Sequence, residues 1–334
     1  MMLPREPLEI KGVRIPNRLV AAPVASATAT PEGRPTEGTL RRVKEILSSC
    51  AGLVIMEHHA VHPWGRARVR QMRLDSDPLV ESHREVASLI EISGAVPLVQ
   101  LNHAGGSVAD LELLNDPTFR CVAPSPVPNP MREHRVVPAE MTPGEVEELP
   151  DLFVSAARRA LEAGYRGVQV HCCHGYLLGQ FLSPITNQRK DRYGGGLMNR
   201  ARPLFQVVDA LAGAFEDAII SVRLGVADFF PGSSGPGLTP EEGVRVAREL
   251  ASLGVDVIGI SGNLCGYDTP LGFDDYSRLV MEAVGGRCAV ECTGMVRSPE
   301  RAERMLRSGV CHLVGVGRPL LSNPSSVAQW LSQP

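Results

Sequence analysis

RLVAAPVASATAT, residues 18–30, decides the fold class of this chain. The stretch begins as an apolar strand over Arg18–Pro23 and continues into small and polar residues. A doubly wound open sheet normally carries the pattern G-x-G-x-x-G directly after its first strand, and that pattern is absent from these residues. Its absence favours a (β/α)8 TIM barrel over the open sheet, which is the alternative α/β fold.

Seven further apolar runs rich in Val and Ile resemble strands that are buried on both faces of a parallel sheet. They are Leu53–Ala60, Val96–His103, Gly167–Cys172, Ala218–Leu224, Val255–Ser261, Cys288–Thr293 and Cys311–Gly317. Apolar residues at three- and four-residue spacing predict helices over Glu37–Ser49, Pro78–Ser93, Pro143–Ala163, Met198–Phe215, Pro240–Ser252, Asp274–Val284 and Pro299–Ser308. This alternation predicts a single-domain TIM barrel over residues 1–334.

Local signals mark where several of these helices begin and end. TPGEVEE (142–148), TPEEGVR (239–245) and SPERAER (298–304) each place Thr or Ser before Pro, with acidic residues in the first turn. Glycines that follow the last apolar residue of a helix favour its termination. Such glycines are Gly164, Gly254, Gly285 and Gly309.

The composition excludes several classes of function. The chain has 34 Lys and Arg against 37 Asp and Glu, mixed along its length without a basic stripe, so we expect no nucleic-acid partner. No apolar run reaches the ~18–20 residues that span a bilayer. The N-terminal MMLPREPLEIKG lacks the apolar core of a signal peptide. We therefore predict a cytoplasmic protein without a membrane partner, whose eight scattered cysteines are reduced.

Polar residues follow the predicted strands at the point where each strand ends. In TIM barrels the reactive groups lie at the C-terminal ends of the strands, so we expect these residues to share one site. They are His58 and His59, Gln100 to His103, His171 to His174, Arg223, Ser261 to Asn263, and Gly317 with Arg318. The Pro- and Gly-rich stretches 122–131 and 231–239 are predicted to be loops on the same face.

The segment HCCHGY, residues 171–176, admits several interpretations. Four adjacent residues do not readily close a tetrahedron around an ion, and no second cluster completes the ligand set, so no metal is predicted. A disulfide between the neighbouring cysteines would be strained. The histidines could be structural, or they could be a donor pair for one substrate oxygen, with the Tyr176 phenol as a proton donor.

The longer stretch HCCHGYLLGQFLSPITNQRKDRYGGGLMNRAR, residues 171–202, resembles the old yellow enzyme family of FMN-dependent ene-reductases. NRLVAAPV (17–24) is similar to the first strand of that family, and QLNHAGG (100–106) to its third-strand motif. SVRLG (221–225) resembles its arginine-bearing fifth strand, and GVGRPLLSNP (315–324) its phosphate-binding turn. The resemblance covers nearly the whole chain and places these motifs in the family's order.

This resemblance implies that FMN lies across the top of the barrel and is reduced by NAD(P)H, which uses the substrate site and so needs no dinucleotide motif. The implied FMN-binding residues are Pro23, Val24 and Ala25 through their backbone, His58, Gln100, Arg223 near N1 and the C2 carbonyl, and Gly294, Gly317 and Arg318 at the phosphate. His171 and His174 would bind the carbonyl of an α,β-unsaturated substrate, and Tyr176 would protonate its α-carbon after hydride transfer to the β-carbon.

Some positions depart from the family pattern. Ala25 stands where Thr or Cys is usual near flavin O4, and the large His58 stands where a small residue is common. His59 is expected to reach the pocket as well. Further departures are Ala27 for an aromatic residue, Gly106 for Arg, Gly196 for Ser and Met198 for Glu. We expect intact FMN binding with altered reactivity or substrate choice.

Two other functions stay open at this stage. One is a related flavin barrel such as a dienoyl-CoA reductase or an amine dehydrogenase, although this chain lacks clustered cysteines for an iron–sulfur centre. The other is a weakly catalytic flavoprotein that serves as a redox-partner subunit. Family members commonly form homo-oligomers, so a homo-oligomer is also expected.

Overall fold

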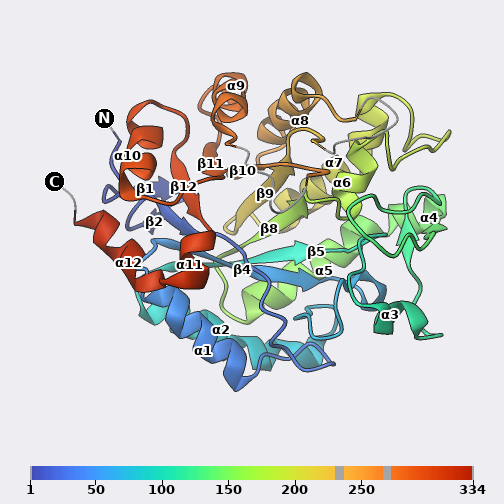
Figure 1. Cartoon of the computed structure of the whole chain (residues 1–334), viewed down its shortest axis with the longest axis horizontal. Helices are drawn as coiled ribbons and strands as arrows, with labels where there is room; N and C mark the ends of the chain where they lie inside the picture. The colour runs from blue at the N-terminus through green and yellow to red at the C-terminus, as the bar shows by residue number, and fades with distance from the viewer. Residues whose placement is uncertain (1, 230–236, 266–271, 333–334) are drawn as a thin grey trace.

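The structure is a computed structural model that describes residues 2–229, 237–265 and 272–332. Eight parallel strands form a closed barrel at its centre, in the order in which they occur along the chain (Figure 1). They are β3 (Leu19–Ala21), β4 (Leu53–Ala60), β5 (Val96–Asn102), β8 (Gly167–Cys172), β9 (Ile219–Gly225), β10 (Val257–Ser261), β11 (Ala289–Thr293) and β12 (Leu313–Val316). The predicted (β/α)8 TIM barrel is confirmed, and each predicted strand overlaps one barrel strand.

Helices surround the barrel on its outer side (Figure 1). The longer ones are α1 (Glu37–Leu47), α2 (Val80–Ile92), α5 (Leu149–Glu162), α7 (Leu197–Ala214), α8 (Pro240–Ser252), α9 (Asp274–Val284) and α10 (Pro299–Arg307). Their buried residues recur at three- and four-residue spacing, as Phe153, Ala156 and Ala160 do in α5. Two short helices, α11 (Arg318–Ser322) and α12 (Pro324–Ala328), follow the last strand.

The predicted helix boundaries have the expected hydrogen bonds. Thr142 and Thr239 each form a capping box with the glutamate three residues later, and Ser298 accepts a hydrogen bond from the Arg301 amide. The stop glycines Gly164, Gly254, Gly285 and Gly309 all have positive φ angles.

The structure differs from the predicted helix over residues 143–163. It contains two helices, α4 (Pro143–Glu147) and α5, which meet at Glu148. The reason is Pro150, which has no amide hydrogen and whose ring would clash with a carbonyl of the preceding turn. A 3-10 turn, η2 (Asp77–Leu79), similarly replaces the first residues of the helix predicted to start at Pro78.

An N-terminal hairpin closes the end of the barrel that lies away from the strands' C-termini. Antiparallel β1 (Leu8–Ile10) and β2 (Val13–Ile15) carry Ile10 and Ile15 into an apolar cluster with the first residues of the barrel strands. Arg18 links this hairpin to the barrel, because its guanidinium donates to the carbonyls of Pro7 and His312. The sequence analysis did not predict the hairpin, since its strands are three residues long.

The opposite face carries long connections with short elements. They are η1 (Pro63–Gly65), α3 (Leu111–Asn115), β6 (Val122–Ala123), β7 (Ala139–Glu140) and α6 (Leu177–Leu182), and a last turn, η3 (Gln329–Leu331), ends the described chain. β6 falls within the predicted loop 122–131 and pairs with β7. Most of the predicted loop 231–239 lies outside the described residues. Across the described ranges, no helix is long and apolar enough to cross a membrane.

The hairpin yields a stability prediction. Ile15 is fully buried in the cluster that closes the barrel, so Ile15→Ala leaves a cavity and is expected to lower the free energy of unfolding by about 2–5 kcal/mol. Urea unfolding followed by circular dichroism measures the change. Ile92→Ala is the matched control, because Ile92 is 82% exposed and should cost less than about 0.5 kcal/mol. Equal losses in the two variants would show that the hairpin does not contribute to the core.

Candidate functional site

A cavity of about 490 Å³ opens at the C-terminal ends of the barrel strands, a size suited to an organic ligand or cofactor. Every residue that the family resemblance implies for the cofactor or the substrate lines it: Pro23, Val24, Ala25, His58, Gln100, His171, His174, Tyr176, Arg223, Gly294, Gly317 and Arg318. Ser261, expected at the end of its strand, also lines the cavity, whereas other lining residues were not predicted from the sequence, among them Arg68, Arg132, Cys265, Phe273, Met295 and Arg297. Most of these belong to long connections, where no strand pattern indicates the direction of a side chain.

Polar side chains from adjacent strands form the layer next to this cavity. Gln100 of β5 donates to Gln169 of β8 (2.8 Å), which donates to Ser221 of β9 (3.1 Å). Glu291 of β11 lies in the same interior, where a Cβ atom on Gly315 would come within 2.2 Å of its Oε1. Gly315 therefore leaves room for this carboxyl group, and burial raises its pKa.

Arg223 extends from β9 into the cavity and is only 8% exposed. Its Nε is buried and has no hydrogen-bond partner, and the guanidinium forms no ion pair with any described residue. A buried guanidinium is costly unless acceptors surround it, so this position fits a ligand that brings oxygen or nitrogen acceptors or negative charge. FMN has such groups at N1 and the C2 carbonyl, and Arg223 is the residue that best tests the fit of this cofactor.

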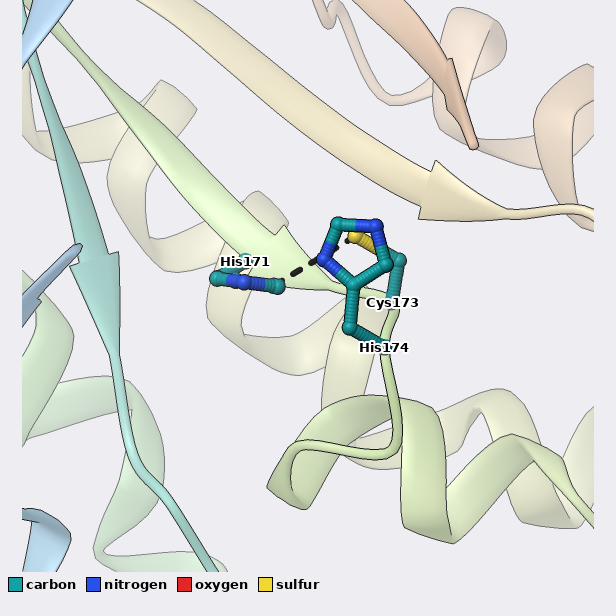
Figure 2. Close-up of side chains that lie close together, drawn as sticks. All are labelled: His171, Cys173 and His174. Carbon is teal, nitrogen blue, oxygen red and sulfur yellow. Dashed lines mark hydrogen bonds between the residues drawn. The ribbon is translucent and has the colours of Figure 1, made fainter. Parts of the chain in front are cut away.

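His171, Cys173 and His174 lie together where β8 ends (Figure 2). Their possible ligand atoms, the histidine ring nitrogens and the cysteine sulfur, are all within 4.8 Å of one another. The three side chains therefore converge more closely than was expected for residues this near in sequence. The Cys173 thiol lies 3.5 Å from His171 Nδ1. Burial raises the pKa of this thiol to about 12, so it is protonated at neutral pH, whereas metal binding needs the thiolate. That no metal binds here stays a prediction.

The backbone at His174 has an unusual conformation. Its φ is 55°, in the left-handed region that residues other than glycine rarely adopt. Two contacts from the end of β10 hold it: its amide donates to the Gly262 carbonyl (3.1 Å), and its Nε2 lies 2.8 Å from Ser261 Oγ. Strained backbone that its surroundings fix in this way is common at functional sites.

His58 has a defined tautomer because the neighbouring Gln71 amide has a fixed orientation. Gln71 Oε1 accepts from the Ala67 amide (2.7 Å), and its Nε2 donates to the His58 carbonyl (3.1 Å). The same Nε2 lies 3.3 Å from His58 Nδ1, which must therefore act as an acceptor. Neutral His58 thus carries its proton on Nε2. Burial, with a smaller effect from Arg68 and Arg132, lowers its pKa to about 4.

Tyr176 lies between these histidines. Its ring centroid is 4.7 Å from that of His171 and 5.4 Å from that of His58. The ring packs on Ala67 and Ala104, and its hydroxyl makes no hydrogen bond within the described parts of the chain. The phenol is therefore positioned by packing and left available to a ligand.

Glu57 positions the first loop of the cavity. A register shift in β4 lies between Met56 and His58, so Glu57 and His58 point in different directions. His58 lines the cavity, whereas Glu57 accepts hydrogen bonds from the amide and hydroxyl of Ser26. Ser26 follows directly after Ala25, so this buried carboxylate fixes the backbone that the cofactor is expected to contact.

Three expectations about neighbouring polar residues are wrong. His59 does not line the cavity; its Nδ1 lies 2.6 Å from the Glu57 carbonyl, and its ring packs against His83 of α2. His103 and Asn263 also face other parts of the protein: His103 accepts from the Gly105 amide, and Asn263 donates to Asp228 and Gly179. The β4 register shift and the local hydrogen bonds, which the sequence pattern does not reveal, decide these directions.

Residues 5–332 match the model of the NADH:flavin oxidoreductase / NADH oxidase family. The chain belongs to this family. It is 34% identical to NADPH dehydrogenase of Geobacillus sp. (strain WCH70) over 333 residues, which cover 95% of this chain and 90% of that protein. The resemblance to old yellow enzymes is confirmed: the homologue from Zymomonas mobilis matches at 26% identity with a TM-score of 0.83, over 99% of this chain and 92% of the other.

The fold is also similar to that of a 2-naphthoyl-CoA reductase complex, with a TM-score of 0.88 at 24% identity. That match covers 98% of this chain and 52% of the other. Family membership makes the protein an FMN-dependent oxidoreductase that uses NAD(P)H. The buried, unpaired Arg223 and the cavity volume agree with FMN as the cofactor.

The buried histidines predict how stability depends on pH. Burial lowers the pKa of His58 and His83 to about 4 and that of His103 to about 3, and it also lowers the pKa of His59, His171 and His174 well below the usual value. Below about pH 6.5 the unfolded chain binds protons that the folded protein does not. The free energy of unfolding should therefore fall as the pH decreases from 6.5 towards 4, by ~1.4 kcal/mol per pH unit for each such histidine.

Urea unfolding of the protein at several pH values measures this slope. His83→Gln is the matched variant, since His83 lies outside the cavity and Gln keeps a donor for the Arg73 carbonyl that His83 Nε2 contacts. It should reduce the slope by about one proton. A free energy of unfolding that does not change between pH 7 and 5 would contradict the neutral, buried histidines.

Proposed function

We propose that this protein is an ene-reductase that reduces the activated C=C bond of α,β-unsaturated carbonyl compounds. The observation that carries the proposal is the convergence of His171, His174 and the unbonded Tyr176 hydroxyl on one side of the cavity. FMN, reduced by NAD(P)H, supplies the hydride for the β-carbon of the substrate. We further propose that the protein is a cytoplasmic homo-oligomer with one FMN-binding barrel over residues 1–334 in each copy.

Neutral imidazoles suit the assigned role of His171 and His174. In this proposal the protonated Cys173 thiol, 3.5 Å from His171 Nδ1, donates to that nitrogen, which leaves the proton of this ring on Nε2. In the same way, the proposal takes the Ser261 hydroxyl, 2.8 Å from His174 Nε2, as the donor to that nitrogen, which leaves the proton of that ring on Nδ1. Each ring then offers one N–H to the substrate carbonyl oxygen, which becomes negative as hydride reaches the β-carbon.

Tyr176 completes the reaction by transferring its hydroxyl proton to the α-carbon. The new C–H bond uses the electron pair of the enolate, so the carbonyl re-forms and the phenolate is left to take a proton from solvent. Packing on Ala67 and Ala104 keeps the phenol in place for this transfer. The two imidazole N–H groups would thus bind the carbonyl oxygen, while the phenol protonates the α-carbon on the other side of the carbonyl carbon.

The remaining lining residues are assigned to the cofactor. Arg223 would bind N1 and the C2 carbonyl, and Gln100 would bind the pyrimidine edge of the flavin. The backbone of Pro23, Val24 and Ala25 would contact the ring, with His58 beside it. Gly294, Gly317 and Arg318 would hold the phosphate, as in the phosphate sites that many barrels carry after their seventh and eighth strands. These glycines and Arg318 follow β11 and β12, which supports that assignment.

Tyr176→Phe tests the proton donor. With 2-cyclohexenone, the variant should lose about 100- to 10,000-fold in the rate at which enone reoxidises the reduced flavin, because the general acid is missing. Flavin reduction by NADPH should stay within a few-fold of the original rate. Stopped-flow absorbance of the flavin measures both half-reactions separately.

Tyr165→Phe is the control, since Tyr165 is buried outside the cavity and its hydroxyl has no hydrogen-bond partner in the described structure. It should leave both rates unchanged. If Tyr176→Phe also reoxidises at the original rate, the phenol is not the acid. If the unmodified protein is bleached by NADPH but no enone restores its absorbance, the ene-reductase proposal itself fails.

A further inference from the structure

The cavity is lined by arginines and by no acidic residue among those that the structure describes. The arginines are Arg68, Arg132, Arg223, Arg297 and Arg318. Arg223 belongs to the flavin ring in the proposed function, and Arg297 and Arg318 follow β11 and β12 beside the proposed phosphate site. Arg68 and Arg132 lie elsewhere, in the connections after β4 and β5, and neither the cofactor nor the reaction accounts for them.

Arg132 lies in a loop that is hydrogen-bonded to the residue before Tyr176. Asn129 donates to the carbonyl of Gly175 (2.8 Å), the residue before Tyr176, and accepts from the amide of Met131 (2.9 Å). Arg132 itself uses only Nε within the described structure, donating to the Ser107 carbonyl (3.1 Å), and it forms no ion pair with a described residue. The terminal nitrogens of its guanidinium are therefore free to bind a ligand in the cavity that it lines.

Arg68 lines the same cavity as Arg132 and Tyr176. Its neighbour Ala67 packs against Tyr176. Asp110 accepts from Arg68 (3.1 Å) and from the Val69 amide (2.9 Å), so this carboxylate both orients the arginine and offsets part of its charge. Burial lowers the pKa of His58, and the positive charges of Arg68 and Arg132 lower it further. One net positive charge remains beside Tyr176 and His58.

We propose that Arg132 and Arg68 form an oxyanion-binding subsite, and that the natural electrophile carries a carboxylate or a similar oxyanion close to its reactive double bond. This inference rests on the proposed function, because it assumes that Tyr176 marks the reacting carbon. Guanidinium groups bind carboxylates and phosphates through paired N–H donors. The neutral Nε2–H of His58 lies on the same side of the cavity and supplies a further donor.

The subsite can be tested by binding, independently of turnover. The probes are a 2-cyclohexenone with a propanoate side chain and the methyl ester of the same compound, which differ in charge and not in the double bond. Isothermal titration calorimetry on the oxidised, FMN-loaded protein should give a Kd for the acid on the order of 10-fold below that of the ester. In Arg132→Gln this preference should disappear, and in Arg132→Lys part of it should return. Raising the salt concentration should weaken binding of the acid only.

Arg135→Gln is the matched control, because it removes the same charge from the same loop at an exposed position outside the cavity. It should bind both probes as the unmodified protein does. Equal Kd values for acid and ester in the unmodified protein would overturn the subsite. So would an Arg132→Gln variant that loses affinity for NADPH, measured from the concentration dependence of flavin bleaching, but not for the acid, since the arginines would then serve the reductant.

Failure of the proposed function gives a different result. If the acid binds more tightly than the ester through Arg132 and neither probe is reduced, the subsite stands and the ene-reductase assignment falls. If both probes are reduced and bind alike, the ene-reductase assignment stands and the subsite falls.

Discussion

The site depends on a cation that the protein buries without an anion to pair with it. Arg223 lies in the mouth of the barrel with its Nε unsatisfied, and removing a guanidinium from water costs free energy unless acceptors replace the water. Glu291 lies in the same barrel interior and interacts electrostatically with Arg223, yet burial raises the pKa of that carboxyl group. The barrel supplies the stability that holds such a group in place, and in the proposed arrangement FMN would supply the acceptors. FMN binding and the integrity of this layer are thus parts of one electrostatic balance.

Burial is the main reason that the histidines lining the cavity are neutral, and the positive charge of the arginines adds to it. Arg223 lowers the pKa of His171 and His174 in addition to the effect of burial, and Arg68 and Arg132 do the same for His58. A neutral imidazole has one N–H, and its neighbours decide which nitrogen carries it. Gln71 makes this choice for His58 through an amide that two backbone groups hold in one orientation. Gln71, which does not line the cavity, therefore decides which nitrogen of His58 carries the proton.

The sequence predicts the barrel well because its signals are local and repeated. Each strand is a short apolar run, and the capping residues at Thr142, Thr239 and Ser298 mark where helices begin. The residues placed in the site by family resemblance all line one cavity. Features that depend on tertiary structure were not predicted. The hairpin that ends at Ile15 has almost no local sequence signal. In β4, one extra residue reverses the alternation of side-chain directions that would have turned His59 inward. The position of Arg132 in the cavity was not predicted, because a loop held by long-range hydrogen bonds determines its direction.

The barrel strands and the connections between them make separate contributions to the cavity. The residues assigned to the flavin lie at the ends of the barrel strands, and the connections after β4, β5 and β8 bring Arg68, Arg132 and Tyr176, respectively, to the cavity. Ala25 removes a hydrogen-bonding side chain near the flavin, while His58 and the two arginines add donors where the ligand lies. In the proposed function, the residues assigned to the flavin serve hydride transfer, and the side chains of the connections select the electrophile. The cavity presents neutral imidazoles and guanidinium groups, with no carboxylate among its described lining residues. Such a lining favours a ligand with negative charge over a neutral enone of the same shape.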